Sequence, residues 1–156
     1  TPWFRGEYTA TDQDPNTAYH SSFCNLVFKK ENGPMSDLFD ITLPILLSAV
    51  DKQNLQLKDL FRIRIGLVTR TPEPIVHPAH KDYHTPHKTG LYYLNQADGD
   101  TIIYNETKES DKYSVKESIE PKLNRWYNFD GAHYHSSTTP TQTEKRIVIT
   151  FNYETN

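Results

Sequence analysis

The sequence predicts a mainly β fold, a double-sheet jelly roll with one or two helices packed on its outer sheet. Ten Tyr, seven Phe and two Trp supply large side chains that favour pleated sheets. Apolar and polar residues alternate in several short segments, as in strands with one buried face. One segment has the spacing of a helix instead. Short strands covered by a helix are typical of a jelly roll.

Length and composition limit the classes of protein to consider. A chain of 156 residues is expected to form one domain, residues 1–156, with a core that needs no disulfide. Cys24 has no partner cysteine, so we expect a reducing, cytoplasmic environment. No long apolar run or signal peptide is present, so no membrane association is expected. The net charge of -3 does not indicate nucleic-acid binding.

Residues 36–50 carry the pattern of an amphipathic helix. Ser36 or Asp37 is suited to cap its start. Pro44 lies inside the segment and removes one backbone hydrogen bond, so the helix either kinks there or begins near Thr42. The apolar positions at steps of three and four are Leu38, Ile41, Ile45, Leu46 and Ala49.

Residues 61–68 alternate as a strand. Arg62 and Arg64 fall on its polar face, where they are either solvated or turned toward a substrate. The following segment, 71–86, contains four prolines and is expected to be extended or looped. The apolar face of the strand consists of Phe61, Ile63, Ile65 and Leu67.

Four further strands are expected before the last one. The pattern of residues 91–95 and 101–104 predicts a hairpin across residues 96–100. Strands at 113–119 and 125–129 follow. We expect the aromatic residues Trp126, Tyr127 and Phe129 to belong to the core rather than to a stacking surface.

The last strand, residues 146–153, has two distinct faces. One face is apolar and must be covered, which a helix on one side of the sheet achieves. The other face, with Arg146, is mixed in polarity and turns toward water or an internal cleft. The covered face comprises Ile147, Ile149, Phe151 and Tyr153, and the other face comprises Arg146, Val148, Thr150 and Asn152.

Histidines gather in two places, and this clustering suggests a metal site. His80 and Asp82 are spaced H-x-D, so in extended structure both side chains project to the same face. A third imidazole from a distant strand would complete a set of two histidines and one carboxylate, which leaves open positions on Fe(II). The first cluster is His77, His80, His84 and His87, and the second is His133 and His135.

The remaining histidines have other readings. We expect His77, His84 and His87 to be solvated surface residues of a Pro-rich loop. A zinc site built from these three and His80 is the competing interpretation, but structural zinc prefers cysteine ligands and the chain has one cysteine.

Three segments together resemble a known family. The run HPAHKDYHTPHKTGLYYLNQADGDTIIYNE is followed by EPKLNRWYNFDGAHYHSS and EKRIVITFNYE. Their elements are H-x-D at 80–82, Y-Y-L-N at 92–95, N-R and F-D-G-x-x-x-H within 124–135, and an Arg that opens the final strand. In order and spacing they resemble the 2-oxoglutarate and Fe(II)-dependent dioxygenases, closest to the prolyl-hydroxylase-like branch and its phage members. The resemblance covers about half the chain, from His77 to Tyr153.

The resemblance implies a role for each matched residue. His80, Asp82 and His135 match the metal ligands. Arg146 lies 11 residues beyond His135, where the family places the cation that binds the distal carboxylate of 2-oxoglutarate. Tyr93 matches the tyrosine that hydrogen-bonds the same carboxylate, and alternation turns Tyr92 and Leu94 to the helix-covered face.

Two features depart from the family pattern. Families with an Arg-x-Ser signature place a hydroxyl two residues after the arginine, where this chain has Val148. That contact is lost or supplied elsewhere. His133 shares a strand face with His135 if the strand runs straight, so either could be the distal ligand, and family spacing favours His135.

The resemblance also implies a fold and an activity. The fold would be a double-stranded β-helix of the cupin type, and the protein would be a virus-encoded or cellular dioxygenase that couples decarboxylation of 2-oxoglutarate to hydroxylation of a C–H bond. Its cofactors would be Fe(II) and 2-oxoglutarate, with ascorbate as reductant, and O2 its second substrate. The hydroxylated partner would be a protein, a peptide or a small molecule, with a peptidyl proline as first candidate. Loops 71–90 and 1–20 would face it.

Two other classes remain open at this point. One is a cupin-like metal enzyme that works without 2-oxoglutarate, such as an isomerase. The other is a non-catalytic jelly-roll module that binds carbohydrate or serves virion assembly. Binding of 2-oxoglutarate separates the first class from an oxygenase, and binding of any metal separates the second.

Overall fold

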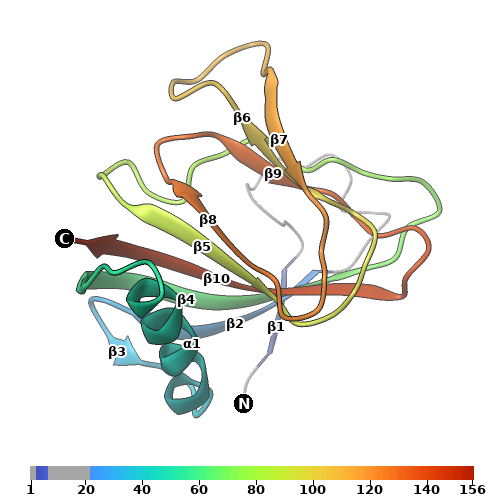
Figure 1. Ribbon diagram of the computed structural model, residues 1–156. Coiled ribbons are helices and arrows are strands. Elements are labelled where there is room, and N and C mark those ends of the chain that lie inside the picture. The colour runs from blue at the N-terminus through green and yellow to red at the C-terminus, as the bar shows by residue number, and fades with distance from the viewer. Residues whose placement is uncertain (1–2, 7–21) are drawn as a thin grey trace.

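Two antiparallel sheets face each other, and one helix covers the outer side of the larger sheet in the computed structural model, which describes residues 3–6 and 22–156 (Figure 1). The large sheet has the strand order β1-β2-β4-β10-β5-β8, with β3 beside β2, and the small sheet has the order β7-β6-β9. The fold is therefore a jelly roll, as predicted. The elements are β1 (Phe4–Gly6), β2 (Ser22–Lys29), β3 (Gly33–Pro34), α1 (Phe39–Asp51), β4 (Leu57–Thr69), β5 (Lys88–Tyr93), β6 (Thr101–Tyr104), β7 (Val115–Ile119), β8 (Trp126–Asp130), β9 (His135–Ser137) and β10 (Lys145–Thr155).

The helix α1 is present where the spacing predicts it, but it begins three residues later. Its first residue is Phe39, and Pro44 lies inside it, so a start near Thr42 is wrong. The Ser36 hydroxyl accepts a hydrogen bond from the backbone N–H of Leu38, just ahead of the first turn. Thr42 Oγ1 donates to the carbonyl of Leu38 at 2.9 Å, which adds a contact in the turn before the proline.

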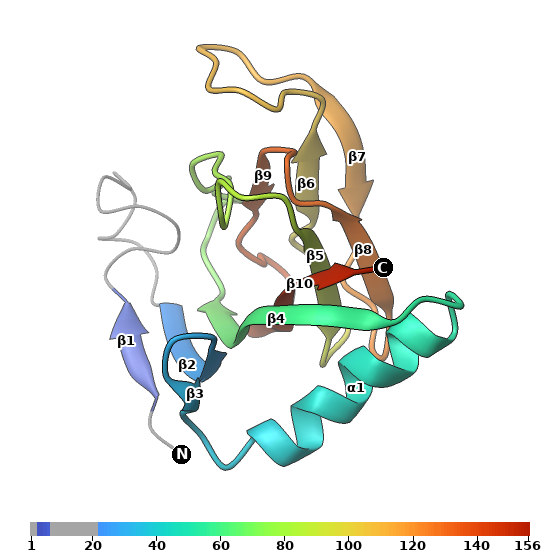
Figure 2. The same ribbon diagram turned by 90° about the vertical axis from the view of Figure 1, so that its left-hand side faces the viewer.

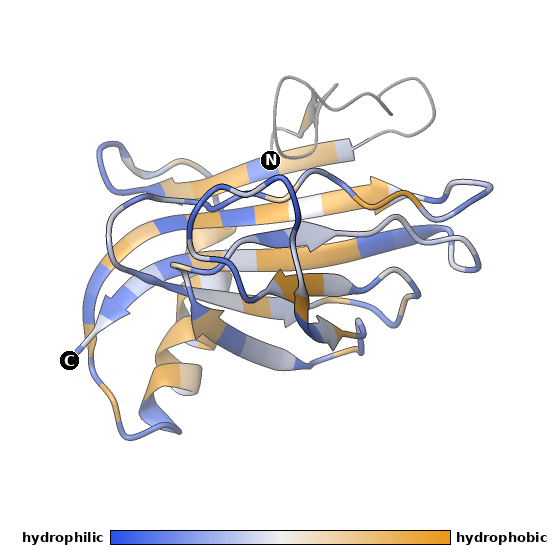
Figure 3. Ribbon diagram, turned by 90° about the horizontal axis from the view of Figure 1, so that it is seen from above, coloured by the Kyte–Doolittle hydropathy of each residue, from blue (hydrophilic) through white to orange (hydrophobic). Residues whose placement is uncertain are grey.

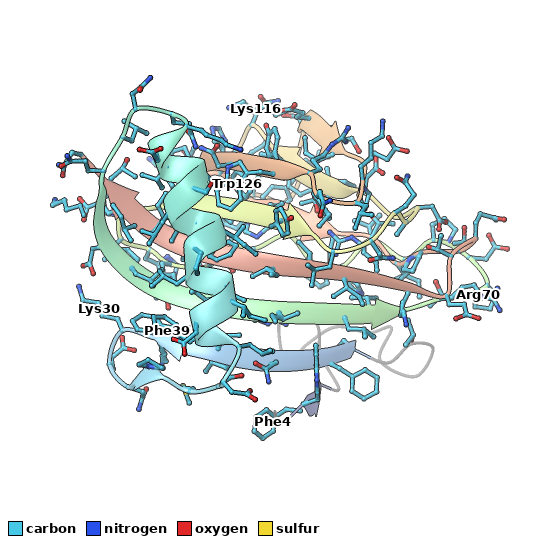
Figure 4. All side chains as sticks on the ribbon, turned by 60° about the horizontal axis from the view of Figure 1, so that its bottom comes forward. Phe4, Lys30, Phe39, Arg70, Lys116 and Trp126 are labelled. Atoms are coloured by element: carbon cyan, nitrogen blue, oxygen red, sulfur yellow. The ribbon has the colours of Figure 1, made fainter. Side chains whose placement is uncertain are left out.

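The outer core lies between α1 and the large sheet. Leu46 and Val50 of the helix are buried against Ile63, Phe151 and other apolar side chains of the sheet. Figure 4 shows α1 lying across the strands, with Phe39 at its start and Trp126 beside it. Full burial of one such aliphatic side chain contributes about 1.5–3 kcal/mol, so this contact is a major source of stability.

The last strand, β10, lies in the centre of the large sheet between β4 and β5. Ile149, Phe151 and Tyr153 are buried in the outer core, as the alternation predicts. Arg146 and Asn152, on the other face, are also buried, which means that this face lines the interior between the sheets rather than water. Figure 3 shows the alternation as bands of opposite colour along the strands.

One residue of the predicted strand at 61–68 turns the other way. The ladder between β4 and β10 pairs Asn152 with Arg62 and then Tyr153 with Leu60, so Phe61 is the extra residue of a β-bulge. Leu60 packs on the outer core, whereas the Phe61 ring contacts Tyr83 on the cleft side. The prediction that Phe61 shares a face with the isoleucines of β4 is therefore wrong.

The predicted hairpin between residues 91–95 and 101–104 is also wrong. β5 pairs with β10 and β8 in the large sheet, and β6 pairs with β7 and β9 in the small sheet. The intervening loop carries the chain from one sheet to the other, and the small sheet lies on the side of the large sheet opposite α1 (Figure 2). The side chains that fill the space between the sheets are Leu91, Tyr93, Ile103, Ile119, Phe129 and Val148, with Tyr127 packed against them.

The predicted core role of the aromatic residues near 126–129 is confirmed. Phe129 lies among the side chains between the two sheets, which form the inner core, and Trp126 packs on the outer core. Tyr92 faces the helix side as predicted. In the described part of the chain, no helix is long and apolar enough to span a bilayer.

Candidate metal centre and carboxylate site

Two histidines from distant parts of the chain meet across a backbone bridge. The N–H of His80 donates to the carbonyl of His135, and the N–H of His135 donates to the carbonyl of His80, both at 3.0 Å. Residues paired in this way project their side chains to the same face. The two rings accordingly lie side by side, with centroids 4.4 Å apart.

Asp82 completes the group, because it follows His80 by two residues in extended chain. Its Oδ1 lies 3.9 Å from Nε2 of His80, and its Oδ2 lies 3.8 Å from Nε2 of His135. These distances are too long for hydrogen bonds. All three ligand atoms lie within 4.8 Å of one another, so there is room between them for an ion.

The ionisation of the three side chains suits a divalent cation. His80 Nδ1 lies 3.1 Å from the carbonyl of Pro78, which can only accept, so Nδ1 carries the hydrogen and Nε2 keeps its lone pair for the centre. Burial lowers the pKa of His135 to about 4, which keeps this imidazole neutral at pH 7. Neutral imidazoles are the form that binds metal.

Asp82 is ionised although it is buried. Burial by itself would raise the pKa of this carboxyl, but the charge of Arg62, with smaller contributions from the two histidines and Asn152, holds the pKa well below its usual range. The group therefore offers two imidazole nitrogens and one carboxylate oxygen, the donor set that non-haem Fe(II) sites use.

Two residues outside this group fix the carboxylate. Arg62 Nη2 donates to Asp82 Oδ1 at 2.7 Å, and Asn152 Nδ2 donates to Asp82 Oδ2 at 2.8 Å. Arg62 Nε also donates to Asn152 Oδ1. Arg62 is therefore neither solvated nor turned toward a substrate, the two positions that its sequence pattern left open.

The other histidines lie apart from this group. His84 is exposed, as predicted, but His77 and His87 are buried, so the prediction that they are solvated is wrong. His77 Nδ1 is hydrogen-bonded to Ser137 Oγ, and His87 Nδ1 donates a hydrogen bond to the carbonyl of Thr85. The described residues contain no zinc-like group built from these side chains.

His133 also lies apart from the two facing histidines. Its Nε2 accepts a hydrogen bond from Lys116 Nζ at 2.9 Å. His135 is thus the distal histidine that the structure brings to His80 and Asp82. The ring of Phe129 packs edge-on against His135 at 5.2 Å and helps hold it in place.

A second polar cluster surrounds Arg146. Its side chain is buried, and Nη2 donates to Thr101 Oγ1 at 2.5 Å. Thr101 Oγ1 also lies 2.8 Å from the hydroxyl of Tyr93, and the guanidinium carbon lies 5.6 Å from the centre of the Tyr93 ring. Burial lowers the pKa of Arg146 and raises the pKa of Tyr93, so the cluster pairs a cation with a protonated phenol.

Thr101 and Asn152 were not singled out from the sequence. Asn152 shares the alternating cleft face of β10 with Arg146, and that pattern alone could have marked it. Thr101 opens β6 in the small sheet, so only the pairing of the sheets reveals its position. The chain has Val148 in place of the serine of an Arg-x-Ser signature, and Arg146 donates a hydrogen bond to the Thr101 hydroxyl.

Both clusters open into one cavity between the sheets. A cation held at the three ligands would share this cavity with the end of Arg146, which suits a small ligand with two anionic ends. The lining residues that carry chemistry are His80, Asp82, His135, Thr101, Arg146 and Arg64.

The fold and the site together define a class: a double-stranded β-helix with a candidate metal centre inside it. No protein-family model matches the chain, and no curated protein matches its sequence.

Solved structures share the fold. A prolyl hydroxylase from Trichoplax adhaerens, in complex with a hypoxia inducible factor oxygen degradation domain peptide fragment, has a TM-score of 0.57 and 16% identity over 85% of this chain and 62% of that one. An oxidoreductase of the 2OG-Fe(II) oxygenase family from Burkholderia pseudomallei has a TM-score of 0.65 and 15% identity, over 97% of this chain and 73% of that one. A Pseudomonas putida prolyl-4-hydroxylase has a TM-score of 0.56 and 13% identity, over 96% of this chain and 77% of that one. At these identities the likeness shows the fold.

Proposed function

We propose that the protein is an oxygenase that uses Fe(II) and 2-oxoglutarate, with His80, Asp82 and His135 as the metal ligands. The observation that carries this proposal is the presence of two complementary clusters in one cavity, the three ligands and the buried Arg146. A metal site alone would suit many enzymes. A buried guanidinium with no carboxylate partner in the described part of the chain calls for an anionic ligand.

Arg146, Tyr93 and Thr101 bind the distal carboxylate of 2-oxoglutarate in this proposal. The planar fork of Arg146 suits a bidentate contact, and the two hydroxyls are additional donors. Arg62 and Asn152 keep the Asp82 carboxylate ionised and oriented toward the centre. When bound, Fe(II) and 2-oxoglutarate supply the oxygen-activating chemistry, which couples decarboxylation to succinate with hydroxylation of a C–H bond.

Part of the cavity wall is apolar. Leu91 and Val148 line the cavity beside the polar residues. Ascorbate would serve as the reductant that keeps iron ferrous. A peptidyl proline is the first substrate to test, because two of the structures that share the fold are prolyl hydroxylases.

Anaerobic titration tests the proposal directly. Protein loaded with Fe(II) should develop a visible charge-transfer band when 2-oxoglutarate is added, and Arg146→Lys should weaken the affinity for 2-oxoglutarate at least tenfold, because lysine cannot form the fork. Arg70→Met is the matched control, since Arg70 is exposed at the end of β4 (Figure 4) and should leave the band unchanged.

Each other class gives a different result. Protein that binds iron but shows no band with 2-oxoglutarate would be a cupin-like metal enzyme of another kind. Protein that binds no divalent metal would be a binding module. Asp82→Ala should abolish metal binding while the circular dichroism spectrum stays that of the native fold, and retained binding would contradict the ligand assignment.

A further inference from the structure

A third arginine, Arg64, lines the cavity and has no use in the proposed binding of metal and 2-oxoglutarate. Its neighbours Ile63 and Ile65 are buried in the outer core, so alternation turns Arg64 to the cleft face of β4. Arg64 lies among the residues that line the cavity, together with His80 and Asp82. It is a cation inside the site, not on the outer surface.

Among the residues that the structure describes, the guanidinium of Arg64 has no acidic partner. Its one hydrogen bond to a described residue runs from Nε to the Sγ of Cys24 at 2.9 Å, and a thiol is a weak acceptor. No carboxylate of the described residues lies within salt-bridge distance. By contrast, Arg62 is paired with Asp82. No described residue accepts a hydrogen bond from the remaining N–H groups of Arg64, so a ligand in the cavity can use them.

The position of Arg64 suits a group bound beside the metal. Arg64 follows Arg62 by two residues on the same strand face, which places their backbones about 7 Å apart. Arg62 reaches the Asp82 carboxylate, so Arg64 is one step farther along the cleft. Thr150, its partner across the ladder, also lines the cavity.

The charges of the site favour a negatively charged substrate. Among the groups described here, Asp82 is balanced by Arg62. In the proposed function the distal carboxylate of 2-oxoglutarate pairs with Arg146, and its other carboxylate binds the divalent metal. Arg64 then remains as a positive charge with no acidic partner among the described residues, and such a charge attracts ligands of the opposite sign.

We infer that Arg64 binds a carboxylate of the substrate and so selects an acidic substrate for hydroxylation. This inference rests on the proposed function. The carboxylate has two chemical sources, the α-carboxylate of a free amino acid and an acidic side chain next to the reacting residue in a peptide. Either presents the flat, two-oxygen group that a guanidinium fork binds in a bidentate way.

Calorimetry on an inert form of the protein tests the inference without turnover. Protein loaded with Mn(II) and saturated with 2-oxoglutarate under argon is titrated with matched pairs: each common L-amino acid against its primary amide, and acetyl-Ala-Pro-Asp-amide against acetyl-Ala-Pro-Asn-amide. In at least one pair the acid should bind at least tenfold more tightly than its neutral counterpart. The type of pair that shows the preference identifies the source of the carboxylate.

Three variants test whether Arg64 causes the preference for the acid over its neutral counterpart. Arg64→Met should bring the affinity ratio close to one, Arg64→Lys should keep part of it, and Arg70→Met should keep all of it. The affinity of Arg64→Met for 2-oxoglutarate should stay within twofold of the wild-type value. A ratio near one in every wild-type pair, an unchanged ratio in Arg64→Met, or loss of 2-oxoglutarate binding in that variant would overturn the inference. Failure of the proposed function would be detected before any substrate is added, because wild-type protein loaded with Mn(II) would not bind 2-oxoglutarate. That result would overturn both the proposed function and the inference about Arg64.

Discussion

Replacing His135 by glutamine should flatten the pH dependence of stability in metal-free protein. The pKa of His135 is about 4 in the folded protein, against 6.5 for an ordinary histidine, because the ring is buried. Between these two values the unfolded chain binds a proton that the folded protein does not, so stability is highest above pH 6.5 and falls as the pH drops toward 4. Each pKa unit is worth about 1.4 kcal/mol, so the gap amounts to about 3 kcal/mol.

Urea unfolding between pH 7 and pH 4, in the presence of a chelator, measures this loss. Wild-type protein should lose about 3 kcal/mol of unfolding free energy more than His135→Gln over this range. Asp82 contributes little to the difference between the two proteins, because its ordinary pKa of 3.8 is approached only at the lower end of the range and both proteins retain this residue. His84→Gln, at an exposed histidine, is the control and should keep the wild-type slope. Equal slopes in wild type and His135→Gln would refute the conclusion that the ring is held neutral by burial.

Three further substitutions test contacts that stabilise the fold, within the site and away from it. Arg62→Met should lower the unfolding free energy of metal-free protein by about 3 kcal/mol, because the buried Asp82 carboxylate loses its cation. Leu46→Ala should lower it by about 2–5 kcal/mol through the cavity left in the outer core, again measured by urea unfolding. Gly131→Ala should lower the melting temperature, since a Cβ there would lie 2.2 Å from Nε2 of His87, and such overpacking costs about 1–3 kcal/mol.

Each of these substitutions has a matched control in the chain. Lys58→Met removes an exposed ion pair with Glu154 and should change stability by less than about 1 kcal/mol. Ile41→Ala truncates an exposed residue of α1. Gly66→Ala adds a Cβ that meets nothing within 4 Å. Effects as large in the controls as in the test variants would show that the assigned contacts do not determine stability.

The alternation of apolar and polar residues was sufficient to predict the faces of regular, extended segments. The alternation at residues 146–153 predicted which side chains pack under α1 and which turn to the opposite side, and the structure shows that this opposite side faces the cleft and not water. The spacing of His80 and Asp82 predicted that both project to one side, because extended chain has a period of two. These predictions depend on dihedral angles that neighbouring residues share, so the sequence carries them directly.

Pairing between distant segments could not be predicted in the same way. Residues 91–95 and 101–104 have the spacing of a hairpin, yet they belong to different sheets. The five residues between them are long enough for either connection, and the choice depends on β10, which pairs with β5 from far along the chain. The strand β2 was missed because its own bulge, between Leu26 and Phe28, interrupts the alternation that marks a strand.

The wrong prediction for the face of Phe61 and the position of Arg62 in the cleft have the same cause, the β-bulge in β4. Arg62 and Asn152 are the last regular pair of the β4–β10 ladder before the bulge, so both side chains still point into the cleft, where they hold Asp82. The bulge then turns Phe61 to the same side, against Tyr83 and away from the helix. Without the extra residue, Phe61 would lie under α1 and the cleft would lose one wall beside the metal ligands. Bulges are frequent next to active sites because they redirect a side chain in this way, and here the place where strict alternation fails adjoins the candidate centre.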